Sequence, residues 1–419
     1  MCLFDILSND SIRDIAISLS LREIKDFCLT NSRLNRIILQ DEGFWHRKFV
    51  HDFNFNLPDY RGNWRQLYQN YTNRNVWVSG TNNNGQLGLG QVERVNVPTR
   101  IPNIKAKQVA CGSNHIIIID LENNVWVCGS NNYGQLGLGD TQNRNVPTPI
   151  PNIKAQQVAA GCDQTIIIDV ENNVWVCGNN DYGQLGLGDT VNRNVLTQIP
   201  NIKAKQVSSR YCHIVLIDME NNVWVCGSNY CGQLGLGDFQ NRNVLTQIPN
   251  IRAQQVLTEH YHTVLIDLEN NVWVCGDNSY GQLGLGDTQN RNVLTPIPNI
   301  KARQVSTGVD YTIIIDLNDN VWVSGNNYCG RLGINQAQAL IPTRIENRKA
   351  QQVSTFGHHS VIIDLNHNVW VSGSNYRGEL GLGDNQDRSG FTQIPNIKAQ
   401  QVSAGYWYTV IIGSLINTN

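Results

Sequence analysis

The sequence predicts a mainly β protein, a closed seven-bladed β-propeller preceded by a small α-helical domain. Seven tryptophans recur at intervals of 48 or 49 residues, each within the pattern Val-Trp-Val-(Cys/Ser)-Gly. The repeats begin and end in the middle of a unit, and roughly the first seventy residues contain no copy of it. A unit of this size cannot bury its own apolar face, so neighbouring units must stack. The tryptophans are Trp77, Trp126, Trp175, Trp224, Trp273, Trp322 and Trp370.

The first fifty residues show helical spacing of apolar side chains. Ile12, Ile15, Ala16 and Leu19 fall at i, i+3, i+4 and i+7. Ser20-x-x-Glu23 has the form of a capping box for a second helix. Two further helices are indicated by two apolar groups, Leu34, Ile37 and Ile38, then Phe44, Trp45 and Phe49. So small a unit leaves much apolar surface exposed, so we expect it to bind a partner.

These apolar positions, with Phe27-Cys28 and the terminal Trp45, resemble an F-box. The resemblance implies docking on a Skp-type adaptor, which links family members to a cullin-based ubiquitin ligase. One departure is Ser8, where the family usually has Pro, and because Pro presets a helix entry we expect Ser8 to loosen this end. A helical cap that only shields the propeller is the alternative. The implied adaptor-binding residues are Leu7, Ile12, Ile15, Leu19, Leu21, Ile24, Phe27, Leu34 and Trp45.

Residues 51–74 connect the helical domain, residues 1–50, to the repeats. Pro58 and Gly62 indicate a turn, and Asn63 is a typical N-cap for a following helix. That helix would carry four aromatic or apolar residues at helical spacing. We therefore expect a packed connecting helix. The four residues are Trp64, Leu67, Tyr68 and Tyr71.

Each repeat contains four β-prone runs separated by Gly, Asn and Pro clusters, as in residues 125–174. Each unit is thus predicted to be one four-stranded blade. Small residues in Val158-Ala159-Ala160-Gly161 suit the crowded axis of a ring and are placed innermost. The Ile-Ile-Ile-Asp run follows, then the Trp run, then Pro-Thr-x-Ile outermost. The loop before Ile-Ile-Ile-Asp and the long Gly-rich loop then share one face, and the Asn-Ile-Lys-Ala and Asp-x-Glu-Asn-Asn turns share the other.

The half-units at the two ends predict how the ring closes. Residues 75–103 and 399–412 together complete one blade, which removes the free sheet edges that would otherwise invite aggregation. The propeller is therefore assigned to residues 75–412, with residues 413–419 as a tail.

The long loop carries Asn-x-Tyr-Gly-Gln-Leu-Gly-Leu-Gly-Asp, and with Gly-x-x-His and Trp-x-(Cys/Ser)-Gly it resembles the repeat of the regulator of chromosome condensation family. Gly-Gln-Leu-Gly-Leu-Gly recurs in five repeats, and Gly378 begins a close variant with Glu for Gln. Repeat six departs with Gly330-Arg331-Leu332-Gly333-Ile334-Asn335, so its loop should differ in shape. The motif lacks the Gly-Lys-Ser/Thr of a P-loop, so a structural turn is favoured over a phosphate site.

Composition indicates an intracellular protein, cytoplasmic or nuclear. The formal charge of −2 and the absence of a polybasic run argue against nucleic-acid binding. The N-terminus has no signal-peptide layout, and the Ile116–Ile119 run is too short to span a bilayer. Four repeats place a cysteine after Val-Trp-Val where others have serine, as at Cys128 and Ser79, which indicates small buried thiols. No metal or cofactor is expected.

One position in each repeat carries a polar or aromatic side chain and begins the Ile-Ile-Ile-Asp run. A position that exchanges His, Gln and Tyr suits a hydrogen-bonding strut better than a catalytic base. No Cys, Asp or Glu group with metal-ligand spacing accompanies it. The strut residues are His115, Gln164, His213, His262, Tyr311, His359 and Tyr408.

The differences between repeats concentrate in the loop before each strut, for example Gly112-Ser113-Asn114 in one repeat and Arg210-Tyr211-Cys212 in another. By the strand order above, these loops surround the mouth of the central channel. Their aromatic and Arg content matches interaction hot spots, although drift in unconstrained loops is the alternative. The predicted substrate-binding face consists of Arg210, Tyr211, Glu259, His260, Tyr261, Asp310, Phe356, His358, Tyr406 and Trp407.

The favoured function is that of a non-catalytic, monomeric substrate-recognition subunit of a Skp-cullin-F-box ubiquitin ligase, with the propeller binding a protein substrate. The alternative is a guanine-nucleotide exchange factor, or a propeller that binds chromatin or a GTPase. Resemblance to the founding family member implies an inserted β-wedge, and the even repeat spacing leaves no room for one. The resemblance also extends to a plant relative that is an ultraviolet photoreceptor and senses light through tryptophans. That role is disfavoured here, because seven of the ten tryptophans belong to the repeated framework and the Gly-Trp-Arg-His-Thr run of the photoreceptor is absent.

Overall fold

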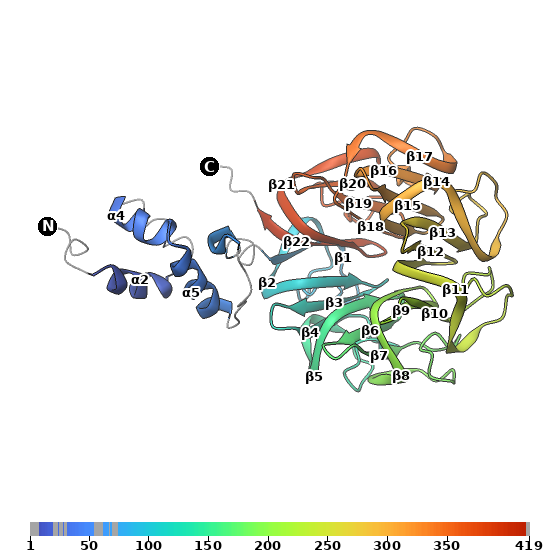
Figure 1. Ribbon diagram of the computed structural model, residues 1–419, viewed down its shortest axis with the longest axis horizontal. Helices are drawn as coiled ribbons and strands as arrows, with labels where there is room; N and C mark the ends of the chain where they lie inside the picture. The colour runs from blue at the N-terminus through green and yellow to red at the C-terminus, as the bar shows by residue number, and fades with distance from the viewer. Residues whose placement is uncertain are drawn as a thin grey trace. The chain divides into compact units, whose positions relative to one another are not determined.

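The computed structural model describes residues 8–19, 24, 28, 32–53, 62–66, 68 and 74–415. The chain divides into two compact units, residues 1–74 and 75–419, the first helical and the second built of strands (Figure 1). Several residues of the sequence predictions lie outside the described ones, so the second helix with its capping box is not described. They are Leu7, Ser20, Leu21, Glu23, Phe27, Pro58, Leu67 and Tyr71.

Short helices form the N-terminal unit. Ser8 caps the first of them, because its side chain accepts a hydrogen bond of 3.1 Å from the Ser11 backbone amide. The expectation that Ser8 loosens this end is therefore wrong, since Ser is itself a favoured N-cap. No helix among the described residues is long and apolar enough to cross a membrane. The helices are α2 (Asn9–Ile17), α4 (Ser32–Leu34), the π-helical turn η1 (Asn35–Leu39) and α5 (Glu42–Phe53).

The helical unit has a closed core of its own. Trp45 is fully buried at its centre and packs against the Tyr68 ring at a centroid distance of 5.2 Å. Asn63 accepts a hydrogen bond of 2.7 Å from the Gln66 amide, which confirms the predicted cap. Tyr68 from the connecting segment completes this core, so the first fifty residues do not enclose it alone, and the expectation that the unit binds a partner stays a prediction. The buried members are Ile12, Ala16, Ile24, Cys28, Leu34, Ile37, Ile38, Phe44, Trp45, Phe49 and Tyr68.

Antiparallel strands build the second unit (Figure 1), and strands of 17 or 18 residues such as β2 and β5 pair with one strand along their first half and with another along their second half, whereas β17 and β18 are separate strands. Its strands are β1 (Asn75–Thr81), β2 (Arg94–Cys111), β3 (His115–Asp120), β4 (Asn124–Gly129), β5 (Arg144–Ala160), β6 (Gln164–Asp169), β7 (Asn173–Gly178), β8 (Arg193–Arg210), β9 (His213–Asp218), β10 (Asn222–Gly227), β11 (Arg242–Glu259), β12 (His262–Asp267), β13 (Asn271–Gly276), β14 (Arg291–Gly308), β15 (Tyr311–Asp316), β16 (Asn320–Asn326), β17 (Gln338–Lys349), β18 (Gln352–Phe356), β19 (His359–Ile363), β20 (Asn368–Gly373), β21 (Arg388–Ala404) and β22 (Tyr408–Leu415).

The strand β5 shows how neighbouring sheets are linked. Its first half pairs with β4 and its second half with β6, which in turn pairs with β7. This pairing confirms the predicted order of strands within a sheet. The run of small residues comes first, followed by the Ile-rich run, the Trp run and the outer run. The predicted turn at Asn-Ile-Lys-Ala is instead a bend within one strand, because Asn152 has a positive φ of 61° and strand pairing resumes at Ala155. Asn tolerates this backbone region better than most residues.

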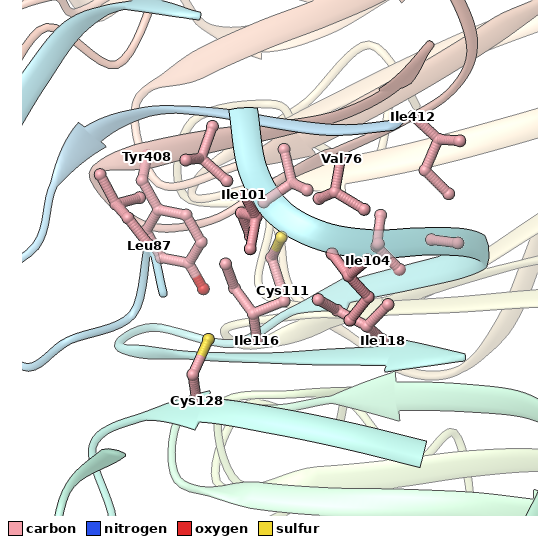
Figure 2. Close-up of a cluster of buried hydrophobic side chains, with 14 residues drawn as sticks. Val76, Leu87, Ile101, Ile104, Cys111, Ile116, Ile118, Cys128, Tyr408 and Ile412 are labelled. Carbon is pink, nitrogen blue, oxygen red and sulfur yellow. The ribbon is translucent and has the colours of Figure 1, made fainter. Parts of the chain in front are cut away.

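The two ends of this unit share one sheet. β22 pairs with β21 on one side and with β1 on the other, where Trp77 lies opposite Ile411, and β1 pairs with the first half of β2. Figure 2 shows the core at this junction, where Val76, Ile412 and Tyr408 pack with side chains from β2 and β3. β22 runs to Leu415, so the first three residues of the predicted tail belong to a strand. The result is a propeller-like fold whose first and last strands pair directly.

Candidate protein-binding surface

The repeated tryptophans hold the framework. In six repeats the indole Nε1 donates a hydrogen bond of 2.8–2.9 Å to the aspartate that ends the Ile-Ile-Ile-Asp strand, as Trp224 does to Asp218. The same aspartate accepts hydrogen bonds from the backbone amides of Glu220 and Asn222. Where Gly413 replaces the aspartate, the Trp77 indole donates to the Gly413 carbonyl instead. These tryptophans are therefore structural.

The long Gly-rich loops join each sheet to the next. Leu138 forms a β-bridge with Val195 of the following repeat, and the Gly139 amide donates to the Asn194 carbonyl. The thiol of Cys128 donates to the Gln86 carbonyl at 3.5 Å, which confirms a buried structural cysteine. These contacts support the structural-turn interpretation of the motif. In repeat six, a 3-10 turn at Tyr328–Gly330 takes its place, in agreement with the altered sequence.

The strut interpretation is confirmed. Each of the four strut histidines contacts a threonine of the next repeat through Nε2, for example His213 with Thr263 at 3.0 Å. The Tyr311 and Tyr408 hydroxyls donate to backbone carbonyls of the neighbouring repeat. All four imidazoles are buried, and this burial lowers their pKa values to about 3 or 4. A buried, neutral imidazole fixed between repeats has no access to a substrate.

The loops before the struts and the long Gly-rich loops lie together, and we call the surface they form the loop face. The Asn114 carbonyl accepts a hydrogen bond from the Ser130 amide, and Gln135 Nε2 donates to Asp163 at 3.1 Å. The turns at the other ends of the strands form what we call the turn face. There Lys154 donates to the Glu122 carbonyl.

Eight of the ten predicted substrate-binding residues are half-buried on the loop face. Glu259 and Phe356 are fully buried, so their assignment as contact residues is wrong. Both lie beneath Arg210, whose guanidinium carbon is 4.1 Å from the Phe356 ring centroid and whose Nε is 3.9 Å from a Glu259 carboxyl oxygen. Arg210 also donates to the Cys111 carbonyl at 3.0 Å. The side chain thus joins loops from four repeats.

Glu259 is an unusual carboxyl group. Neither of its oxygens accepts a hydrogen bond of normal geometry from a described residue. Burial raises its pKa to about 8, an effect that Arg210 and the His260 backbone amide oppose. At neutral pH the carboxyl group is therefore mostly protonated, and it packs beneath Arg210 of the loop face.

Aromatic rings cluster on the loop face in two groups. In the first, Tyr211 stacks on His260 at 3.8 Å and contacts Tyr261 edge-on at 5.4 Å. Tyr182 and Tyr230 form a further edge-on pair at 5.9 Å. Tyr211 holds a positive φ of 46°, which is strained for a bulky residue.

In the second group, Trp407 contacts Tyr406 and His358 at 5.0 and 5.5 Å. Arg331 lies beside them, with Nη1 2.9 Å from His358 Nδ1 and Nη2 3.7 Å from an Asp310 carboxyl oxygen. Burial lowers the pKa of His358 to about 4.

Exposed tyrosines in the long Gly-rich loops also lie on the loop face, although they were not predicted as site residues. These tyrosines could have been predicted from the sequence, because the long Gly-rich loop was expected to share a face with the loop before each strut. Arg331, which takes the place of the repeated Gln and contacts two predicted residues, was also missed as a site residue. The exposed tyrosines are Tyr133, Tyr182, Tyr230, Tyr280, Tyr328 and Tyr376.

Four of the six described residues of the predicted adaptor-binding set are interior. Ile12, Ile24, Leu34 and Trp45 are completely buried within the helical unit, and Leu19 is partly buried. Only Ile15, at 42% exposure, is open to solvent among the described members of that set. The expected apolar ridge is therefore wrong for the buried four, because the unit uses them for its own core. Leu7, Leu21 and Phe27 lie outside the described residues.

The fold and the repeated Asp-Trp hydrogen bonds, which we call clasps, define a propeller-like repeat protein with a variable loop face. The family model of the regulator of chromosome condensation (RCC1) repeat matches more than half of the chain, and a second RCC1 repeat model matches residues 106–135. The chain belongs to this family. The first model matches residues 75–119, 122–168, 171–215, 269–315 and 366–412.

Solved structures share the fold. A structure described as Kap60 bound to yeast RCC1 (Prp20) is 20% identical, with a TM-score of 0.76 over 83% of this chain and 90% of that one. Human WBSCR16 is 21% identical, with a TM-score of 0.74 over 82% and 99%. Prp20p from Saccharomyces cerevisiae, described together with its binding to Gsp1p and histones, is 21% identical, with a TM-score of 0.75 over 83% and 92%. A comparison with curated protein sequences finds no similar protein.

Proposed function

We propose that this chain is a non-catalytic binding protein, a closed seven-bladed RCC1-repeat propeller that holds a partner protein on its loop face. One observation carries the proposal: an almost unvarying framework supports loops that differ in every repeat. The Asp-Trp clasps and the His-Thr struts recur, whereas the loops between them carry Tyr211, His260, Tyr406 and Trp407 in half-buried positions. Half-buried aromatic side chains on a rigid support are typical of interaction hot spots.

The similar structures favour a GTPase or chromatin protein as the partner over a ligase substrate. Prp20p is described with binding to Gsp1p and histones, and the matched family models lie wholly within the propeller unit. The described strands of residues 74–415 follow the repeat from end to end, with no additional strand pair inserted between repeats. Binding of such a partner is therefore the function that the geometry supports best.

The adaptor role is retained as a second candidate because of one exposed side chain. Ile15 lies on α2 at 42% exposure, next to the buried Ile12 and Ala16 of the same helix. Ile15→Asp should abolish co-purification of a Skp-type adaptor without unfolding the helical unit. Arg36→Asp, also on the helical unit, is the control and should leave binding intact. If the adaptor is retained equally by both variants, Ile15 is not the docking residue, and if no Skp-type adaptor co-purifies with the native chain, the adaptor role is wrong.

The loop face is tested by paired variants with matched controls. Tyr261→Ala with Trp407→Ala should weaken partner capture by roughly thirtyfold or more, since hot-spot aromatics cost about 2 kcal/mol or more when truncated. Lys154→Ala with Lys203→Ala, on the turn face, should leave capture unchanged. Both lysines donate only to turn carbonyls or to an Asn side chain there. Capture can be measured by quantitative mass spectrometry of proteins bound to the immobilised full chain. If the lysine pair abolishes capture and the aromatic pair retains it, the turn face is the binding surface.

A further inference from the structure

Five aromatic residues of repeats three to five lie near one another on the loop face as a trio and a pair, and Tyr182 of the pair is close enough to Tyr211 and Tyr261 of the trio for electrostatic interaction. Tyr211, His260 and Tyr261 are in mutual ring contact, with centroid distances of 3.8 to 5.4 Å. Tyr182 and Tyr230 come from the long loops of two adjacent repeats and contact each other edge-on. Tyr230 is 62% exposed. We call these five residues the aromatic patch.

Carboxylates flank the aromatic patch. The charges of Asp163 and Asp181 act on Cys212, which lies between Tyr211 and the strut His213. Asp277 acts on His260 and on Cys231, the residue that follows Tyr230. Asp181 is exposed, whereas Asp163 and Asp277 are partly or largely buried. Asp181, which precedes Tyr182 in the chain, is therefore the exposed carboxylate beside the patch, whereas burial raises the pKa of Asp163, and Asp277 is hydrogen-bonded to Ser279 and Gln282.

The arginines of the neighbouring loops are directed elsewhere. Arg210 points to Cys111, Glu259 and Phe356, beneath the loop face. Arg193 and Arg242 pair with the aspartates four residues before them, both at 2.6 Å. His260 is neutral at pH 7, because burial lowers its pKa to about 4.

We propose that the aromatic patch binds a lysine or arginine side chain presented by a basic segment of the partner protein. This inference rests on the proposed function, in which the loop face receives a partner. The faces of tyrosine rings attract cations through their quadrupole, and the exposed Asp181 carboxylate adds charge complementarity. The ring contacts between Tyr211, His260 and Tyr261 hold the patch in shape before the partner arrives.

The same loop in repeat six provides a natural comparison. Tyr230 and Tyr328 occupy identical Asn-Tyr-Cys-Gly sequences and are both 62% exposed. Tyr328 lies next to His358, which is bonded to the guanidinium of Arg331. A cation should therefore be attracted to Tyr230 and disfavoured at Tyr328, although the two side chains are equally exposed.

The test uses a fluorescein-labelled hexalysine peptide and the full chain, with fluorescence anisotropy as the readout. Tyr230→Leu should raise Kd by about threefold, and Tyr211→Leu with Tyr261→Leu by about tenfold, the range expected for exposed cation–π contacts. Tyr230→Phe keeps the ring and should retain binding, whereas Tyr328→Leu should have no effect. Asp181→Asn should weaken binding and reduce its dependence on salt.

Three results would overturn this inference. These are hexaglutamate binding as tightly as hexalysine, equal losses for Tyr230→Leu and Tyr328→Leu, or no hexalysine binding to the folded chain. The capture experiment with Tyr261→Ala and Trp407→Ala is independent of the charge of the ligand. If those variants lose the partner while hexalysine fails to bind, the loop face is the binding surface but the cationic ligand is wrong.

Discussion

The substitution Glu259→Gln tests the buried centre of the loop face. The carboxyl group has a pKa of about 8 in the folded protein and about 4.5 in the unfolded chain. Between these values the folded state binds more protons than the unfolded state, so the free energy of unfolding falls as the pH rises. The stabilising contribution is complete below pH 4.5 and is lost as the pH passes through 8. Glutamine has nearly the same shape and does not ionise.

The size of the effect follows from the two pKa values. They differ by three and a half pH units, and each unit corresponds to about 1.4 kcal/mol. The stability of Glu259→Gln relative to the native protein should therefore grow by about 5 kcal/mol between pH 4.5 and pH 8. It should then stay constant at higher pH.

The assay is urea unfolding followed by tryptophan fluorescence across this pH range. The buried strut histidines are present in both proteins, so their titration cancels in the difference. Glu171→Gln is the control, because Glu171 is exposed on the turn face and its substitution should leave the pH profile unchanged. Parallel profiles for the native protein and Glu259→Gln would show that this carboxyl group ionises normally and is not buried as described.

Three further predictions concern the framework. Asp218→Ala removes the acceptor of four hydrogen bonds and should lower the free energy of unfolding in urea by about 3 kcal/mol or more. Glu220→Ala is the control and should lower it little, and equal losses for the two variants would contradict a stabilising role of the Asp218–Trp224 contact. Burial lowers the pKa of His262 to about 4, so the free energy of unfolding should fall as the pH drops below 6.5, by up to about 1.4 kcal/mol per pH unit. If His262→Gln shows the same dependence of stability on pH as the native protein, His262 is not the cause of this fall. Deleting residues 401–419 unpairs β1, so calorimetry should show loss of the single cooperative transition; unchanged melting would contradict closure through the chain ends.

Much of the framework could be predicted from the repeat itself. The strand order followed from side-chain size, and the strut role followed from the exchange of His, Gln and Tyr at one position. The bend at Asn152 was predicted as a turn, because Asn and Pro indicate a change of direction without showing whether the backbone ladder continues. The pairing of β1 with β22 matches what the half-units at the chain ends imply.

The site was harder to predict because burial there depends on contacts between distant repeats. Glu259 and Phe356 are covered by Arg210, which is 49 residues or more from either of them in the sequence. Nothing local distinguishes a loop residue that faces solvent from one that lies beneath a neighbouring arginine. In the helical unit, Ile12 and Ile15 share one spacing pattern, and packing alone decides that the first is buried and the second is exposed.

Site-specific photocrosslinking tests the central claim, that the loop face holds the partner, most directly. The photoreactive residue p-benzoyl-phenylalanine would replace Tyr230 on the loop face or Lys203 on the turn face, in the otherwise intact chain. The account predicts that irradiation links a partner protein to the position 230 variant and leaves the position 203 variant free. A crosslink formed only from position 203 would contradict it and would place the partner on the turn face.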